Sequence, residues 1–129
     1  MVILGGSAAA LAAALAAADD GGANVSVCLS EPTDWLGGQL TSSLITAIDF
    51  GHANEQPARL ARSLAALLGH LGFPARNPGA CWVSKLCYRV DDALEWIDEA
   101  VRSRPQIRVL TMAVPIAVES SGGGGGGGG

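Results

Sequence analysis

The stretch Val2-Ile3-Leu4-Gly5-Gly6-Ser7-Ala8-Ala9-Ala10 decides the fold. It reads as a short apolar strand that turns on two glycines into a helix of alanine and leucine. Gly5 fits the first position of a GxGxxG fingerprint, while Ser7 and Ala10 stand where the second and third glycines would. Such a turn leaves backbone N–H groups and the positive end of the helix dipole facing open space. We therefore predict a seat for a pyrophosphate at this turn.

A second apolar run, residues 24–30, ends at Glu31. Val25, Val27 and Leu29 alternate with polar or small residues, which is typical of a strand. An acid at the end of the second strand, a little over twenty positions past the glycine turn, can accept hydrogen bonds from a ribose hydroxyl. Each feature also has a purely structural interpretation. The turn can be an ordinary glycine turn before an alanine-rich helix, and Glu31 can be an ordinary acid at a strand end. Together the two features favour a dinucleotide site, with FAD as its ligand and Glu31 at the ribose.

The remaining pattern predicts the fold class. We expect helices over residues 7–18, 55–71 and 91–103, the last with Asp91 or Asp92 as N-cap and Glu95 completing a capping box. We expect strands over residues 2–4, 24–30, 44–48 and 107–118, with a break at Pro115. This order predicts an α/β, Rossmann-like parallel sheet with flanking helices. Residues 1–119 would form this domain, and residues 120–129, two serines followed by eight glycines, would be a disordered tail.

Composition excludes several classes of protein. The net charge is −4 and no Lys/Arg cluster is present, which argues against a nucleic-acid partner. The first eighteen residues are apolar but lack the basic residues of a signal peptide, and alanine-rich segments are poor membrane spans. We therefore expect a cytoplasmic protein, with secretion less favoured and no membrane partner.

The cysteines do not form a recognisable site. Cys28, Cys81 and Cys87 contain no CxxC pair and are odd in number, so neither a zinc site nor a disulfide framework is indicated. We expect thiols in a reducing compartment and no metal. A redox pair of Cys81 and Cys87 remains the alternative.

A specific resemblance to a known family is carried by the run Glu31-Pro32-Thr33-Asp34-Trp35-Leu36-Gly37-Gly38-Gln39-Leu40-Thr41. It resembles the segment after the second strand in FAD-dependent oxidoreductases of the glutathione-reductase-like superfamily, which have two dinucleotide-binding domains. The resemblance is good over residues 2–49 and looser as far as Glu119. It implies FAD as cofactor, with its pyrophosphate held by the backbone of Gly5, Gly6, Ser7, Ala8 and Ala9 and its ribose by Glu31. It also implies that Gly37, Gly38, Gln39 and Leu40 lie at the middle of the cofactor and Val114 at the adenine.

The resemblance also implies chemistry, namely hydride transfer between flavin and a small-molecule substrate that the sequence does not identify. No catalytic residue can be named, since Asp49, His52 and His70 lack a supporting pattern. In the family a three-stranded meander and a substrate domain follow, so we expect an incomplete FAD-binding domain that needs a partner or the missing remainder. A nicotinamide-dependent Rossmann oxidoreductase and a truncated, non-catalytic nucleotide-binding fragment are the alternatives.

Overall fold

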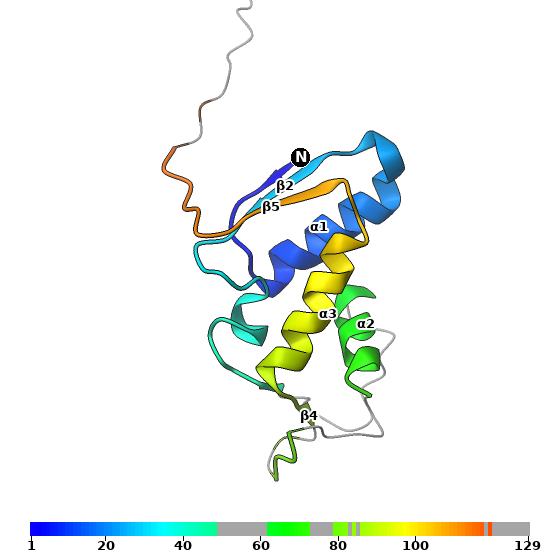
Figure 1. The fold of residues 1–129 in the computed structure, drawn as a ribbon, viewed down its shortest axis with the longest axis vertical. Coiled ribbons are helices and arrows are strands. Elements are labelled where there is room, and N and C mark those ends of the chain that lie inside the picture. The colour runs from blue at the N-terminus through cyan, green and yellow to red at the C-terminus, as the bar shows by residue number, and fades with distance from the viewer. Residues whose placement is uncertain (49–61, 73–78, 83, 85, 118, 120–129) are drawn as a thin grey trace, which may run out of the picture.

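The computed structural model of the chain describes residues 1–48, 62–72, 79–82, 84, 86–117 and 119 (Figure 1). Its strands are β1 (Val2–Ile3), β2 (Val27–Ser30), β3 (Ala47–Ile48), β4 (Leu86–Cys87) and β5 (Ile107–Leu110). Its α-helices are α1 (Ala8–Gly21), α2 (Arg62–His70) and α3 (Val90–Arg102), and two short 3-10 helices cover Gly22–Asn24 and Gly38–Leu40. The predicted tail, residues 120–129, and the first part of the predicted helix 55–71 lie outside the described residues.

The main sheet is parallel, with strand order β1-β2-β5. Val2 lies opposite Cys28 in the central strand β2, and Val27 lies opposite Ile107. The chain moves in the same direction across the sheet from β1 to β2 and from β2 to β5. Because connections between parallel strands are right-handed, α1 in the first connection and α3 in the second lie on the same face of the sheet. Figure 1 shows α1 and α3 together on one side of the sheet. The α/β, Rossmann-like parallel sheet with flanking helices is thereby confirmed.

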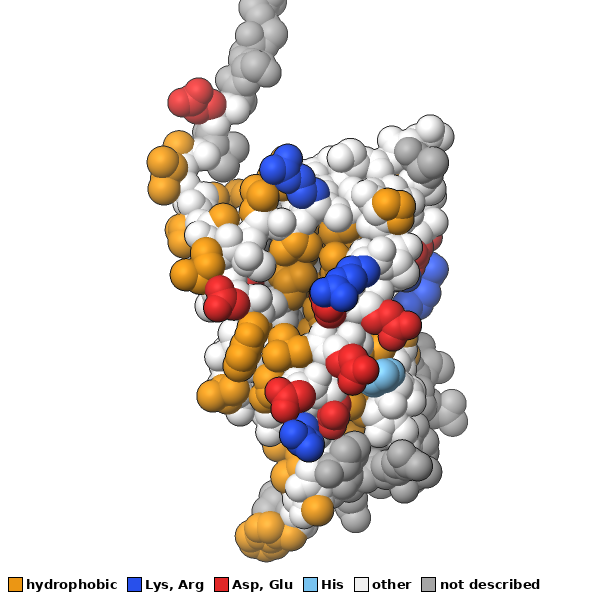
Figure 2. Space-filling view, viewed as in Figure 1, with side chains coloured by type: hydrophobic (Ala, Val, Ile, Leu, Met, Phe, Trp, Pro, Cys, Tyr) orange, Lys and Arg blue, Asp and Glu red, His pale blue; other side chains and the backbone are white. Residues whose placement is uncertain are grey.

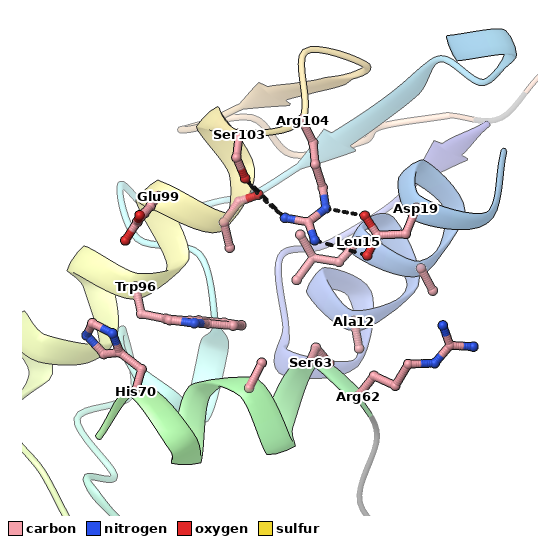
Figure 3. A pocket seen from close by; sticks show the side chains of 13 residues that line it. Ala12, Leu15, Asp19, Arg62, Ser63, His70, Trp96, Glu99, Ser103 and Arg104 are labelled. Atoms are coloured by element: carbon pink, nitrogen blue, oxygen red, sulfur yellow. Dashed lines mark hydrogen bonds and ion pairs between the residues drawn. The ribbon is translucent and has the colours of Figure 1, made fainter. Parts of the chain in front are cut away.

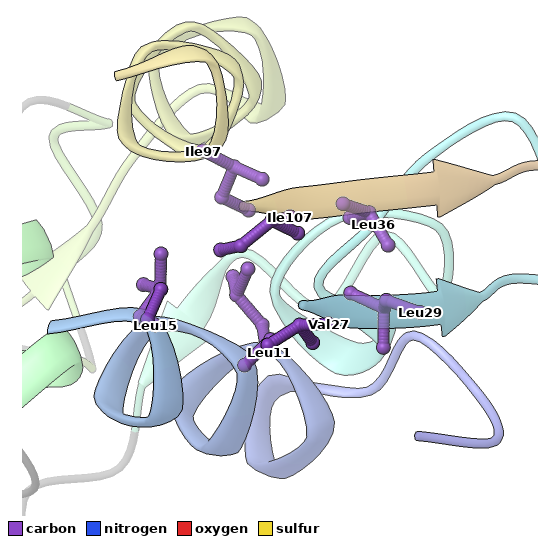
Figure 4. Close-up of a cluster of buried hydrophobic side chains, with 9 residues drawn as sticks. Leu11, Leu15, Val27, Leu29, Leu36, Ile97 and Ile107 are labelled. Atoms are coloured by element: carbon purple, nitrogen blue, oxygen red, sulfur yellow. The ribbon is translucent and has the colours of Figure 1, made fainter. Parts of the chain in front are cut away.

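One core lies between the sheet and its two helices. Leu11 and Leu15 of α1 and Ile97 of α3 point toward the strands (Figure 4). They meet Val27 and Leu29 of β2, whose side chains are fully buried. The alternation predicted for the second strand is therefore confirmed, and it directs the apolar side chains of β2 to the helix face.

The opposite face, which we call the outer sheet face, is formed by Val2, Cys28, Arg108 and Leu110. Val2 is 70% exposed and Leu110 is 37% exposed, while the thiol of Cys28 is free and half-buried. Apolar burial thus occurs mainly on one side of the sheet. The stability of the sheet depends on α1 and α3 in consequence.

The outer surface of α3 carries the acidic side chains that gather in the middle of Figure 2. Asp91, Glu95, Asp98 and Glu99 are all exposed there. None of the helices among the described residues is long and apolar enough to cross a membrane. In the same part of the chain, no cluster of three or more His, Cys, Asp or Glu residues could hold a metal ion.

Helix α1 is longer than predicted. It continues through Asp19 and Asp20 to Gly21 and stops at Gly22, whose φ of 54° an L-residue rarely adopts. The next three residues form a 3-10 turn, so β2 begins at Val27 and not at residue 24. The predicted strand over residues 107–118 was also too long, because a turn with Met112 at φ 54° ends pairing after Leu110.

The capping prediction for α3 was wrong. The N-cap is Arg89, which makes no side-chain capping hydrogen bond, and the helix starts at Val90. Asp91 and Asp92 lie within the first turn, where they face the positive end of the helix dipole. Their negative charges therefore stabilise the start of the helix through the dipole and not through a capping hydrogen bond.

The expectation of separate thiols was also wrong for two cysteines. Cys81 and Cys87 form a disulfide, with their Cα atoms 6.0 Å apart. Cys87 lies in β4, which pairs antiparallel with β3. This pairing fixes the position of one sulfur, and the other belongs to a residue only six positions earlier in the sequence.

Candidate functional site

The glycine turn connects β1 to α1. Gly5 has a φ of 89°, and its N–H donates to Ser30 Oγ at 3.1 Å, which ties the turn to the end of β2. Gly6 is required for space and not for backbone conformation, because a Cβ there would overlap the side chain of Glu31 and come within 2.8 Å of Leu36 Cδ2. The turn therefore packs directly on the acid that the sequence assigns to the ribose.

Ser7 caps α1. Its Oγ accepts from the N–H of Ala10 at 3.2 Å, and its carbonyl accepts from Leu11 at 2.8 Å. The N–H groups of Ala8 and Ala9 find no acceptor in the described part of the chain, as expected for the first turn of a helix. These donors lie where the predicted pyrophosphate would bind, and the helix dipole adds a partial positive charge.

Glu31 directly follows β2 and is only 3% exposed. Its Oε1 accepts from both the N–H and the Oγ1 of Thr33, each at 2.7 Å. Its other carboxylate oxygen, Oε2, lies against Gly6. The carboxylate is thus held at the glycine turn by Thr33, a residue that we did not single out. An acid followed two positions later by threonine is a signal that could have identified it.

The segment from Leu36 to Thr41 lies on the same turn. The N–H of Gly37 donates to the carbonyl of Gly6 at 2.7 Å, and Ser7 and Gly37 form an isolated parallel bridge. Gly38 has a φ of 56° and passes so close that a Cβ on it would be 3.1 Å from Ser7 Cα. The glycine doublet therefore lets two backbones meet beside the start of α1.

Thr41 holds this segment in place. Its side chain is fully buried, and its hydroxyl donates to the carbonyl of Leu36. No pattern in the sequence singles this threonine out.

Thr41→Val should lower the free energy of unfolding by about 1 to 2 kcal/mol, because valine keeps the shape but leaves a buried carbonyl without its donor. Urea unfolding of the purified chain measures this loss. Thr41→Ser keeps the hydroxyl and should lose less than Thr41→Val. Equal losses for the two variants would show that the hydroxyl does not matter.

The chain after β5 also reaches this site. Leu110 accepts from the N–H of Glu31 at 2.8 Å, and the N–H of Ala113 donates to the carbonyl of Glu31 at 2.9 Å. Val114 is therefore next to the acid in space, with its side chain 67% exposed. We call the assembled set the half-site; it comprises residues 5–9, Glu31, residues 37–40 and Val114.

An apolar cavity of about 490 Å³ opens beside the half-site. Ala8, Ala9, Gln39 and Leu40 line it, together with side chains from α2 and α3. Glu31 does not line it. The half-site thus has a polar end at the acid and an apolar end at the 3-10 turn.

A second cavity, of about 570 Å³, lies among the three α-helices (Figure 3). Trp96 reaches into it from α3, and Arg104 forms a bidentate ion pair with Asp19 at 2.6 and 3.0 Å. The hydrogen bond from Arg104 lowers the pKa of Asp19 below its ordinary value. Of the weaker candidates, His70 lines this cavity and is exposed, whereas Asp49 and His52 lie outside the described residues.

Asp19→Asn should lower the stability of the protein at pH 7 by at most about 1 kcal/mol, because the pair is partly solvated. The folded pKa of Asp19 is lowered, so its contribution is present at neutral pH and is lost as the pH falls below about 4. Urea unfolding at pH 7 and at pH 3 should show a smaller acid loss for the variant than for the parent. If parent and variant lost the same free energy of unfolding between pH 7 and pH 3, the ion pair would not contribute to the stability of the protein.

Comparison with known proteins agrees with this geometry. The family described as FAD dependent oxidoreductase matches residues 1–126, almost the whole chain. No curated protein and no solved structure matches it. The family's cofactor is FAD, and neither the nicotinamide-dependent nor the non-catalytic alternative is favoured. The chain therefore belongs to the FAD dependent oxidoreductase family.

Proposed function

We propose that the half-site binds the adenosine diphosphate portion of FAD. The observation that carries the proposal is the meeting of three segments at Gly6. Gly6 belongs to the glycine turn, the carboxylate of Glu31 lies against it, and the N–H of Gly37 donates to its carbonyl. Anion donors at the start of α1 and a ribose acceptor at the end of β2 are thereby brought to the same glycine turn.

Each residue of the half-site has a role in this proposal. The backbone of Gly5, Gly6, Ser7, Ala8 and Ala9 holds the pyrophosphate, because unpaired N–H groups and the helix dipole favour negative charge. Glu31 accepts from the ribose, and its negative charge disfavours a 2′-phosphate. Gly37, Gly38, Gln39 and Leu40 support the middle of the cofactor, and Val114 lies at the adenine.

The residues present fit the cofactor. The N–H groups of Ala8 and Ala9 have no acceptor among the described residues, so they are available to an anion. Glu31 Oε1 accepts two hydrogen bonds from Thr33 and retains capacity to accept another. The buried carboxylate is already held in position by its two hydrogen bonds from Thr33, so binding does not have to order it. The 3% exposure of Glu31 implies that the turn after it shifts slightly to admit a ribose.

When bound, FAD supplies the hydride-transfer chemistry of the family, and the protein supplies binding and orientation. We propose a small-molecule substrate and membership of the glutathione-reductase-like superfamily, supported by the run from Glu31 to Thr41. We also propose that residues 1–119 form the FAD-binding domain.

FAD retention tests the proposal. The chain, with and without residues 122–129, is purified by gel filtration, and bound FAD is measured by absorbance and fluorescence. We expect flavin at a fixed ratio to protein, and tighter binding of FAD than of NAD. A folded chain, judged by circular dichroism, that holds no FAD on titration would overturn the proposal.

A further inference from the structure

The Cys81–Cys87 disulfide is asymmetric in its surroundings. Cys81 is half-buried and precedes Trp82, whose side chain is 96% exposed. Cys87 is only 2% exposed, and a Cβ on Gly79 would come within 2.6 Å of its sulfur. An incoming thiolate therefore reaches Cys81 Sγ more readily than Cys87 Sγ.

The buried sulfur also accepts a hydrogen bond that favours its departure as a thiolate. The N–H of Cys81 donates to Cys87 Sγ at 3.2 Å. A hydrogen bond to sulfur strengthens when the sulfur becomes a thiolate, and a stabilised thiolate leaves faster. Accessibility and hydrogen bonding thus favour the same direction of attack.

Cys87 is connected to the half-site through its neighbour. Tyr88 is 3% exposed, and its hydroxyl donates to the carbonyl of Leu40 at 3.0 Å. Its N–H donates to the carbonyl of Thr46 at 3.1 Å, and Cys87 itself pairs with Ala47. One short strand therefore holds both ends of residues 40–47. Burial raises the pKa of Tyr88, so its hydroxyl keeps its proton and remains a donor at neutral pH.

We propose that Cys81–Cys87 is a redox-active disulfide that exchanges with a dithiol, and that its reduction loosens residues 38–48 beside the half-site. The consequence for the cofactor rests on the proposed function; the exchange itself does not. Because the disulfide is in contact with β3 through β4, its redox state and the order of the Gly38–Leu40 turn are linked.

The exchange balances as follows. A thiolate of the dithiol attacks Cys81 Sγ, the S–S bond breaks, and its electron pair leaves on Cys87 as a thiolate. The second thiol of the reagent then attacks the mixed disulfide and releases Cys81. The protein gains two electrons and two protons, and the dithiol is oxidised to a disulfide.

Reduction removes the crosslink that holds β4 against residues 79–81. The bond from the N–H of Gly79 to the carbonyl of Cys87, at 2.7 Å, then keeps this loop in place without covalent support. Tyr88 becomes freer to leave Leu40, and residues 38–48 open more often. In a reducing compartment this would make cofactor retention sensitive to the local dithiol supply.

The site of attack is tested with glutathione, a monothiol, on the native full chain carrying Cys28→Ser. After rapid acid quenching, peptide mass spectrometry should find the mixed disulfide on Cys81. A mixed disulfide mainly on Cys87, or reduction only after denaturation, would overturn the proposal that this is an exchange site.

The coupling is tested by hydrogen exchange of the same chain with and without dithiothreitol. Amide exchange in residues 38–48 should become about 3- to 30-fold faster on reduction, within the range expected for so short a crosslink. The Cys81→Ser, Cys87→Ser double variant should match the reduced parent and ignore dithiothreitol. Unchanged exchange in residues 38–48 on complete reduction would overturn the coupling.

FAD titration of both redox forms separates the two proposals. Weaker FAD binding in the reduced form supports both of them. If neither form binds FAD, the proposed function fails while the exchange and hydrogen-exchange results still decide this inference. If FAD binds equally to both forms, the half-site stands and the link from the disulfide to cofactor retention fails.

Discussion

Replacing Glu31 with alanine should weaken FAD binding by about 1.5 to 3 kcal/mol, the range for a lost hydrogen bond to a charged group. This corresponds to a roughly 10- to 150-fold higher Kd. The carboxylate lies against Gly6 beside the start of α1, where the ribose and pyrophosphate of the cofactor would bind. Titration of the apo chain by flavin fluorescence measures the change.

The control for Glu31→Ala is Glu99→Ala, because Glu99 is an exposed acid on α3, away from the half-site. It should leave the Kd unchanged. Since Glu31 is buried and accepts from Thr33, the variants are first compared by thermal unfolding. An unchanged Kd in a folded Glu31→Ala protein would remove Glu31 from the site.

Gly6→Ala should lower the free energy of unfolding by about 2 to 3 kcal/mol, the upper part of the range for overpacking. The new methyl group would overlap Glu31 and lie within 2.8 Å of Leu36 Cδ2. Because it would also displace the carboxylate, FAD binding should fall even where the variant folds. Urea unfolding and FAD titration are the two measurements.

Gly69→Ala is the matched control for Gly6→Ala. Gly69 lies within α2, and no atom comes within 4 Å of the position of an added Cβ. Alanine there should raise stability by about 0.4 to 1 kcal/mol, because it restricts the unfolded chain. A Gly6→Ala protein as stable as the parent would mean that Glu31 does not pack on the turn.

Local sequence signals predicted the centre of the fold well. The turn at Gly5, the alternation at Val27 and Leu29 and the position of Glu31 each depend on neighbours within a few residues. All three segments were found where the pattern placed them. Their assembly at Gly6 confirms that they meet, while their contact with FAD stays a prediction.

Long-range contacts explain the errors. Asp19 looked like a helix end, but its carboxylate pairs with Arg104, 85 positions later, and α1 continues past it. The Cys81–Cys87 disulfide was only the alternative expectation, because the position of Cys87 depends on the pairing of β4 with β3, about 40 positions earlier in the chain. Tyr88 was missed for the same reason, since its hydroxyl bonds to the carbonyl of Leu40, 48 positions earlier. Thr41 was missed although its partner, the carbonyl of Leu36, is only five positions away.

The strand order has a consequence for synthesis of the chain. Val27 of the central strand pairs with Ile107, which the ribosome adds 80 positions later. At ordinary rates of translation that interval is about 4 to 16 s. For most of that time the buried side chains of β2 lack α3 and β5 as partners, so the nascent chain depends on slow, long-range closure. Chaperone binding to nascent chains should therefore be greatest before residue 110 emerges.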